Sequence, residues 1–216
     1  MIVTIDGPAG AGKSSVARRL AEELGFEYLD TGAMYRAVAL ACVERSTSLG
    51  DVEAVAGVAG EMKLQLKNDR VLVDGSDVTD SIRSMHVTSL IHYVADNPAV
   101  RWRLVELQRN IAAQVDIVTE GRDQGTVAFP DAECKFFLTA SPAERARRRL
   151  SELELRGETT TFAEVLLQQE ERDQRDATRP VGALVKAVDA VEIVTDGLTL
   201  EQTVKQLKGI IEARQN

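Results

Sequence analysis

The sequence predicts an α/β fold in which a five-stranded parallel sheet is flanked by helices. Three observations predict it. Short apolar runs recur along the 216 residues, and segments with helical periodicity separate them. A glycine-rich loop follows the first apolar run, as it does in many parallel α/β sheets. Hydrophobic residues make up 44% of the chain, which is enough for a sizeable core in a single domain over residues 1–216.

The first apolar run, residues 2–5, predicts a buried strand. The loop Gly7-Pro8-Ala9-Gly10-Ala11-Gly12-Lys13-Ser14 that follows fits the pattern G-x-x-x-x-G-K-[ST] without a mismatch. Val16, Leu20 and Leu24 then fall on one side of a helix, which a glycine ends. Strand, loop and helix together form the context that this phosphate-binding motif requires. They argue against a glycine-rich turn that contains Lys-Ser by chance.

The residue types in this loop suit a nucleoside triphosphate. Glycines let backbone N–H groups approach the phosphates, and the start of a helix favours an anion. Lys13 supplies a cation for the β- and γ-phosphates, and the Ser14 hydroxyl can ligate Mg²⁺. The expected ATP-binding residues of the loop are Gly7, Pro8, Ala9, Gly10, Ala11, Gly12, Lys13, Ser14 and Ser15.

The next segment predicts a strand, two helices and a small antiparallel insert. Residues 26–29 predict a second strand, and residues 33–45 predict a helix for which Asp30-Thr31 is the cap. Leu64 and Leu66 alternate with polar residues, as in a half-buried strand. The other predicted elements here are a short helix at 51–61, a turn at Asn68-Asp69, a return strand at 71–73 and a short strand at 77–78. The insert has too few apolar residues to fold alone.

The second half of the chain returns to the α/β alternation. A weak helix is predicted over residues 84–95, and Pro98 then opens a long helix through Ala113 with Asn97 as its cap. The remaining elements are strands at 115–119 and 134–138, a helix from Ser141-Pro142 that Gly157 breaks, a polar helix at 162–175, a strand at 191–194 and a helix at 198–213. Ligands are expected at the carboxyl ends of the parallel strands.

Composition excludes several classes of partner. The net charge of −8 argues against bulk attraction to nucleic acid or to an anionic membrane. Cys42 and Cys134 each lie in an apolar stretch and predict core positions, and His86 and His92 do not form a metal-binding pattern. No signal peptide or membrane-length apolar run is evident. A cytoplasmic protein is expected, with no nucleic-acid or membrane partner and with nothing that demands more than a monomer.

Arginines are concentrated where the parallel strands end. Arg makes up 19 of the 26 basic residues. Arg36 follows the second strand and Arg122 follows the strand at 115–119, so both belong to the edge of the sheet where the phosphate loop lies. Arg forms bidentate contacts with phosphate that Lys cannot form. Several such residues beside a triphosphate loop predict a second phosphate-bearing ligand.

Two predicted helices carry further arginines. Arg172, Asp176 and Arg179 share one helix face at spacings of four and three residues. Arg145, Arg148 and Arg149 share a face in the same way, although the run 147–149 alone is typical of a solvated surface.

At this point the sequence resembles the bacterial cytidylate kinases, a family of nucleoside monophosphate kinases. The resemblance covers nearly the whole chain. It rests on Thr4-Ile5-Asp6-Gly7-Pro8, Asp30-Thr31-Gly32-Ala33-Met34-Tyr35-Arg36, Gly121-Arg122-Asp123-Gln124-Gly125-Thr126 with Phe129-Pro130, and Glu171-Arg172-Asp173 through Arg179. These motifs are more specific than the phosphate loop.

The resemblance implies a P-loop core, a monophosphate-binding insert at about 50–97 and a mobile lid at about 142–180. It implies ATP-dependent transfer of phosphate to CMP and dCMP, with Mg²⁺ as the metal. The CMP-binding residues would be Thr31, Arg36, Arg101, Arg122, Asp123, Arg172, Asp176 and Arg179. Lys13, Arg122, Arg148 and Arg179 would act in catalysis, and Arg145 and Arg149 would contact ATP.

The chemistry of cytosine supports the assignment of the base. Cytosine presents an amino donor beside ring acceptors, so Asp123 suits the donor and Arg101 suits the acceptors. The chain departs from the family in carrying His92 where a serine near the sugar is common, which leaves the sugar contacts there open. It is also open whether Glu120 reaches Mg²⁺ through water.

Two other interpretations of the function stay open. A P-loop kinase of another small acceptor shares the phosphate loop, but the insert and the Asp123/Arg101 pair argue against it. A nucleotide-binding regulatory module is the alternative from another class. The chain lacks the Asn-Lys-x-Asp guanine motif of the regulatory GTPases.

Overall fold

The computed structural model describes residues 1–67, 70–155 and 157–215. The predicted turn at Asn68-Asp69 therefore lies outside the described residues. The chain divides into two compact units. The first consists of Met1–Tyr28 and Val115–Asn216, and the second is Leu29–Gln114.

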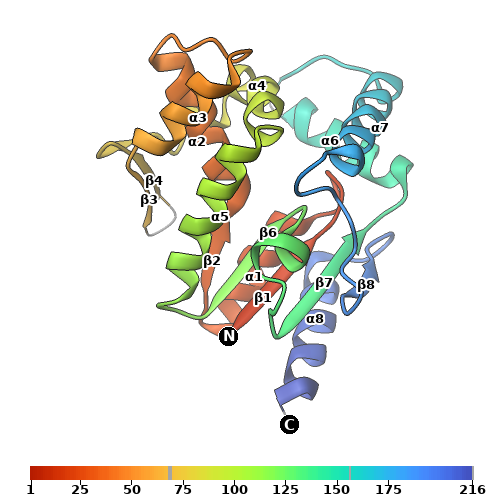
Figure 1. The fold of residues 1–216 in the computed structure, drawn as a ribbon. Coiled ribbons are helices and arrows are strands. Elements are labelled where there is room, and N and C mark those ends of the chain that lie inside the picture. Colours follow the sequence, from red (N-terminus) through yellow and green to blue (C-terminus); the bar gives the residue numbers. More distant parts are fainter. Residues whose placement is uncertain (68–69, 156, 216) are drawn as a thin grey trace. The chain divides into compact units, whose positions relative to one another are not determined.

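Five strands form the main sheet, as predicted. They are β1 (Ile2–Asp6), β2 (Glu27–Asp30), β6 (Ile117–Gly121), β7 (Cys134–Thr139) and β8 (Val191–Val194), in the order β2-β6-β1-β7-β8 (Figure 1). Strand β1 runs parallel to both neighbours, and its last residue, Asp6, is in register with Gly121 on β6 and Phe137 on β7. The segments that follow β1 and β6 consequently leave the sheet at the same edge.

Two helices cover one face of this sheet. Helix α1 (Lys13–Leu24) and helix α8 (Leu200–Gln215) pack against each other and against the strands (Figure 1). Leu20 of α1, Phe136 of β7 and Leu207 of α8 are among the fully buried residues of one core cluster. Removal of such side chains from water is the main stabilising contribution to this unit. The packing also fixes the start of α1 beside the end of β1.

Helices α6 (Pro142–Leu155) and α7 (Phe162–Thr178) pair with each other through a small separate cluster. Ala146, Leu153 and Val165 form its buried part. A capping box of Thr161 and Glu164 starts α7, and the helix continues three residues beyond the predicted end at residue 175. Arg179 caps the helix and lies just outside it. Its side chain still reaches Asp176, three residues earlier, at 2.7 Å.

The second unit contains the predicted antiparallel sheet and four of the helices. Strands β3, β4 and β5 pair in that order, and both pairings are antiparallel. The elements are α2 (Thr31–Glu44), α3 (Val52–Glu61), β3 (Leu64–Lys67), β4 (Arg70–Val73), β5 (Ser76–Asp77), η1 (Ser81–Arg83), α4 (Met85–Ala95) and α5 (Pro98–Ala112). Asp30, Asp51, Ser84 and Asn97 are the caps that start its four α-helices.

The Asn97→Ala substitution is expected to lower the free energy of unfolding by about 2 kcal/mol. The Asn97 side chain is 3% exposed and accepts from the N–H groups of Ala99 (3.1 Å) and Val100 (3.3 Å) at the start of α5. Its amide also donates to the Val52 carbonyl at 2.8 Å. Thermal unfolding checks the prediction. Ser84→Ala is the control, because its hydroxyl accepts one 3.4 Å bond and should matter less.

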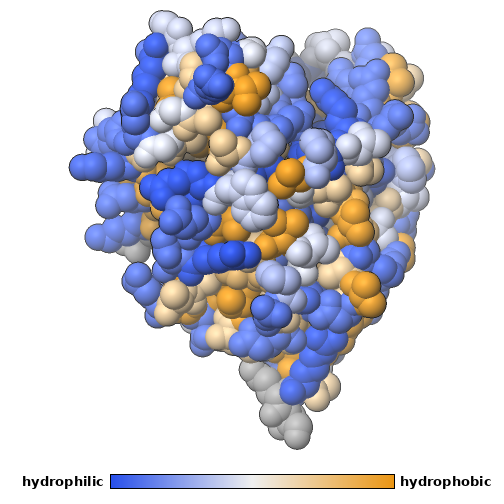
Figure 2. Space-filling model, in the orientation of Figure 1, coloured by the Kyte–Doolittle hydropathy of each residue, from blue (hydrophilic) through white to orange (hydrophobic). Residues whose placement is uncertain are grey.

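In the described part of the chain, no helix is both long and apolar enough to cross a membrane. Figure 2 shows hydrophobic and hydrophilic residues intermixed on the face that it draws. Apolar atoms contribute more than half of a typical protein surface, so this mixture is ordinary.

Candidate active site

The phosphate loop joins β1 to α1 and takes a conformation that requires glycine. Gly7, Gly10 and Gly12 have φ angles of 147°, 77° and 87°. A Cβ atom on Gly7 would lie 1.9 Å from the carbonyl oxygen of Leu138 on β7, so no other residue fits there. Lys13 begins α1, and its Nζ donates to the Pro8 carbonyl across the loop at 2.8 Å.

Lys13 is 5% exposed and lies among other charged groups of the first unit. Burial lowers the pKa of Lys13 to about 7, and the positive charges of Arg122 and Arg172 lower it as well. Glu120 and Asp6 act in the opposite direction. A bound polyphosphate would place negative charge at this cation and favour its protonated form.

Ser14 and Glu120 present oxygen atoms side by side. The Ser14 hydroxyl donates to Glu120 Oε1 at 2.9 Å, and Glu120, the residue before the last of β6, has only 6% of its surface exposed. Among the described residues there is no cluster of three or more His, Cys, Asp or Glu side chains that could hold a metal by themselves. Mg²⁺ in kinases is bound by one or two protein oxygens together with substrate phosphates, so this pair fits it.

Asp176 on α7 holds two of the predicted phosphate-binding arginines. Arg122 Nε donates to Asp176 Oδ2 at 2.7 Å, and Arg179 donates to Asp176 Oδ1, also at 2.7 Å. Burial alone would raise the pKa of Asp176, but Arg122, Arg172 and Arg179 together hold it below its usual range. Burial and the charge of Arg122 lower the pKa of Arg172 to about 10. One carboxylate thus stands among several cations, and an anionic ligand would relieve their mutual repulsion.

The three arginines predicted to share a face of α6 have different partners. Arg145 is 5% exposed, donates to the carbonyl of Ala9 in the phosphate loop at 3.1 Å, and pairs with Asp173 of α7 at 2.6 Å. Arg149 pairs with Glu152 of its own helix at 3.1 Å.

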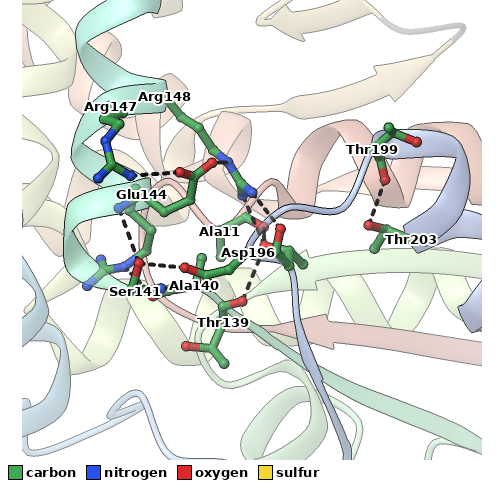
Figure 3. A network of polar contacts seen from close by, with 12 residues as sticks. Ala11, Thr139, Ala140, Ser141, Glu144, Arg147, Arg148, Asp196, Thr199 and Thr203 are labelled. Carbon is green, nitrogen blue, oxygen red and sulfur yellow. Dashed lines mark hydrogen bonds and ion pairs between the residues drawn. The ribbon is translucent and has the colours of Figure 1, made fainter.

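Arg148 is joined to the loop that follows β8. It donates to the hydroxyl and the carbonyl of Thr195 at 3.0 and 2.7 Å, and to Glu144 at 3.0 Å. The Thr195 hydroxyl also contacts the carbonyl oxygen of Ala11 in the phosphate loop at 3.3 Å. Figure 3 shows this network, in which Ser141 is also bonded to Asp196. The contacts fix α6 to the phosphate loop within the first unit.

The other predicted acceptor-binding residues lie in the second unit. Thr31 is buried at the start of α2, and Arg36 pairs with Asp30 at 3.3 Å. Arg101 is 3% exposed, donates to the Ala95 carbonyl at 3.0 Å, and lies 5.4 Å from the centre of the Tyr35 ring. The placement of these three residues around one acceptor together with Asp123 and Arg122 of the first unit stays a prediction.

Sequence reasoning assigned no role to three residues that the structure joins to the site. Thr195 and Asp173 contact Arg148 and Arg145, respectively. Asp6 accepts from the backbone N–H groups that follow Asp123. Asp6 and Asp173 stand in the motifs Thr4-Ile5-Asp6-Gly7-Pro8 and Glu171-Arg172-Asp173, which could have drawn attention to them, whereas the sequence pattern offered no indication for Thr195.

The chain is similar to known proteins over nearly its whole length. The profile of the family described as Cytidylate kinase matches residues 3–213. The cytidylate kinase of Rhodopirellula baltica is 50% identical over 211 residues, which are 98% of this chain and 92% of that protein. The cytidylate kinase of Pelotomaculum thermopropionicum is 50% identical over 216 residues, with 98% and 96% covered. A crystal structure of an uncharacterized protein from Eubacterium ventriosum covers 98% of each chain with a TM-score of 0.55 and 13% identity, which is a similarity of fold alone.

Proposed function

The chain belongs to the cytidylate kinase family, and we propose that it transfers the γ-phosphoryl group of ATP directly to CMP and dCMP. The products are ADP with CDP or dCDP. The observation that carries the assignment of roles is the group of cationic side chains beside the phosphate loop. The positive charges of Arg122 and Arg172 lower the pKa of Lys13. Asp176 accepts hydrogen bonds from Arg122 and Arg179, which hold its own pKa below the usual range.

The reaction forms a bond from an oxygen of the acceptor phosphate to the γ-phosphorus and breaks the bond from that phosphorus to the β–γ bridging oxygen. The loop glycines and Lys13 hold the donor, and Lys13 stabilises the charge that develops on the transferring group. Arg122 and Arg179 hold the acceptor phosphate in line with it, together with Arg36. No protein nucleophile is needed, because positioning and electrostatics supply the catalysis.

Ser14 would hold Mg²⁺, with Glu120 beside it. When bound there, the ion would neutralise charge on the β- and γ-phosphates. The Ser14–Glu120 contact supports this assignment because it pairs a hydroxyl with an ionisable carboxylate at the start of α1. Thr31, Arg101 and Asp123 would read the cytosine, and Arg172 and Asp176 would contact the sugar hydroxyls.

An assay of ADP release with each nucleoside monophosphate tests the proposal. CMP and dCMP should be the best acceptors, and CMP should raise the melting temperature more than AMP, GMP or UMP do. Activity confined to a non-nucleotide acceptor such as shikimate would favour the other class of P-loop kinase. Nucleotide binding without phosphoryl transfer to any acceptor would favour a regulatory module.

The segment 142–180 is expected to act as a lid, with Gly157 as a flexible point. Gly157 has a φ of 74° in the turn after α6. Hydrogen exchange across 142–180 should slow when ATP and CMP are both bound. Within the segment, we expect Arg145, Arg148 and Arg149 to turn toward ATP as the lid closes. Unchanged protection in the presence of both nucleotides would show a static surface.

We also propose that the enzyme acts as a cytoplasmic monomer. Both cysteines are buried and unpaired in the structure, which suits a reducing compartment. Light scattering on the purified protein measures the oligomeric state, and fractionation of the cells measures the location.

A further inference from the structure

Asp6 connects the end of β1 to the turn that follows β6. Its side chain is 3% exposed. One carboxylate oxygen accepts from the N–H of Gln124 at 2.9 Å, and the other accepts from the N–H of Gly125 at 2.7 Å. These residues begin the short π-helical turn Gln124–Ala128, which was not predicted from the sequence. Both oxygens of one buried carboxylate are therefore used to hold one turn.

The turn lies directly after two residues with expected roles at the acceptor. Arg122 and Asp123 connect Gly121, the last residue of β6, to Gln124. The Asp123 carbonyl accepts from Val127 and Ala128, so the turn closes back on Asp123. Displacement of the turn would move both residues, because no flexible segment separates them from it.

The turn also packs closely against β1 and β7. A Cβ atom on Gly125 would lie 3.0 Å from the Thr4 hydroxyl oxygen, 3.3 Å from Lys135 Cδ and 3.4 Å from Asp6 Oδ2. The Gln124 side chain is held as well, since its amide oxygen accepts from the Thr119 hydroxyl at 2.9 Å. The position of the turn thus depends on these close contacts and on the two charge-assisted bonds that Asp6 accepts from its backbone.

We propose that Asp6 is a positioning residue that sets the acceptor-binding pair Arg122 and Asp123 through the backbone of the turn Gln124–Ala128. The inference rests on the proposed function. Asp6 precedes the phosphate loop, but its proposed role is in binding the acceptor and not in binding ATP. An ionised carboxylate suits this role because it can only accept hydrogen bonds, and both of its partners are donors.

The charge state of Asp6 makes the role measurable. Burial raises the pKa of Asp6 to about 6, against the lowering effect of the two backbone N–H groups. The charge of Asp123 raises it further, and the charge of Lys13 lowers it. Lys135, which also lies close to Gly125, is paired with Asp189 at 2.8 Å. Protonation would turn one acceptor oxygen into a donor that faces an N–H group.

The first test is Asp6→Asn, which keeps the shape but places an amide NH₂ against a backbone donor. The KM for CMP is expected to rise about tenfold or more, while the KM for ATP stays within about twofold. The matched control is Glu133→Gln, which changes another carboxylate that accepts from a backbone N–H, that of Ile2 at the start of β1, at 2.8 Å. This control should leave both KM values unchanged. An equal rise of both KM values in Asp6→Asn, or no rise in either, would overturn the proposal.

The second readout is the pH profile of kcat/KM for CMP. In the wild type it should fall more steeply below pH 6 than in Asp6→Asn. The comparison removes the contribution of the CMP phosphate, which also titrates near pH 6. Identical profiles would contradict the role of Asp6.

A second variant covers the case in which Asp6→Asn does not fold. Gly125→Ala displaces the same turn, because the added Cβ would lie 3.0 Å from the Thr4 hydroxyl oxygen, and it keeps the carboxylate. It too should raise the KM for CMP and not that for ATP, and equal effects on both would count against the proposal. A wild-type enzyme with no activity toward CMP would instead refute the proposed function. If the wild-type enzyme is active and both variants keep its KM values for CMP and ATP, only this inference is refuted.

Discussion

Replacing Lys13 by alanine is expected to lower kcat about a hundred- to a thousandfold. Lys13 is the cation placed at the start of α1, and its interaction with the transferring phosphoryl group strengthens as charge develops there. Steady-state kinetics with ATP and CMP measures the effect. Lys208→Ala is the control, because Lys208 is an α8 lysine whose contact is a 3.4 Å ion pair with Glu23. Wild-type turnover in Lys13→Ala would contradict the role of the phosphate loop.

The fold of Lys13→Ala should remain intact. The pKa of Lys13 is lowered from 10.5 to about 7, chiefly by burial. Between these values the unfolded chain binds more protons at this site than the folded chain does, so stability rises with pH across that window. The melting temperature of the nucleotide-free wild type, measured relative to Lys13→Ala, should therefore increase from pH 7 to pH 9. A difference in melting temperature that does not change with pH would show that folding does not lower the pKa of Lys13.

The Asp176→Asn substitution is expected to lower kcat/KM for CMP about tenfold or more and to change the ratio of CMP to dCMP use. An ionised carboxylate can accept a hydrogen bond from the ribose 2′-hydroxyl, which dCMP lacks. The melting temperature should fall as well, because Asp176 compensates Arg122 and Arg179 at 2.7 Å each. Kinetics with both acceptors and thermal unfolding without ligand measure the two effects.

The two effects of Asp176→Asn separate two roles. If the residue only pairs with the arginines, both acceptors should be used less well by the same factor. An unchanged ratio with a lower melting temperature would reject the sugar contact and leave the role of Arg122 standing. Glu152→Gln is the control, since it weakens an exposed pair with Arg149 on α6 and should affect neither the ratio nor the melting temperature.

Local pattern was enough to predict most of the secondary structure. The phosphate loop between β1 and α1 was recognisable because glycine spacing and a Lys-Ser pair are needed in consecutive positions. Gly25, with a φ of 69°, ends α1 where the apolar spacing stops. Asn97 caps α5 because its side chain is short enough to reach the first free N–H groups. The order of apolar runs also predicted the parallel sheet, whose central strands β6, β1 and β7 are buried along most of their length.

The fold class, the phosphate loop and the family could be predicted without a structure, because they depend on residues that are adjacent or regularly spaced. Which distant residues meet became known only from the folded chain. Asp6 contacts Gln124 at a separation of 118 residues, Arg122 contacts Asp176 at 54, and Arg148 contacts Thr195 at 47. The π-helical turn after Asp123 has no periodic pattern of its own and depends on a carboxylate from another strand. Such contacts are selected by the packing of strands and helices against one another, and no local preference of the chain specifies them.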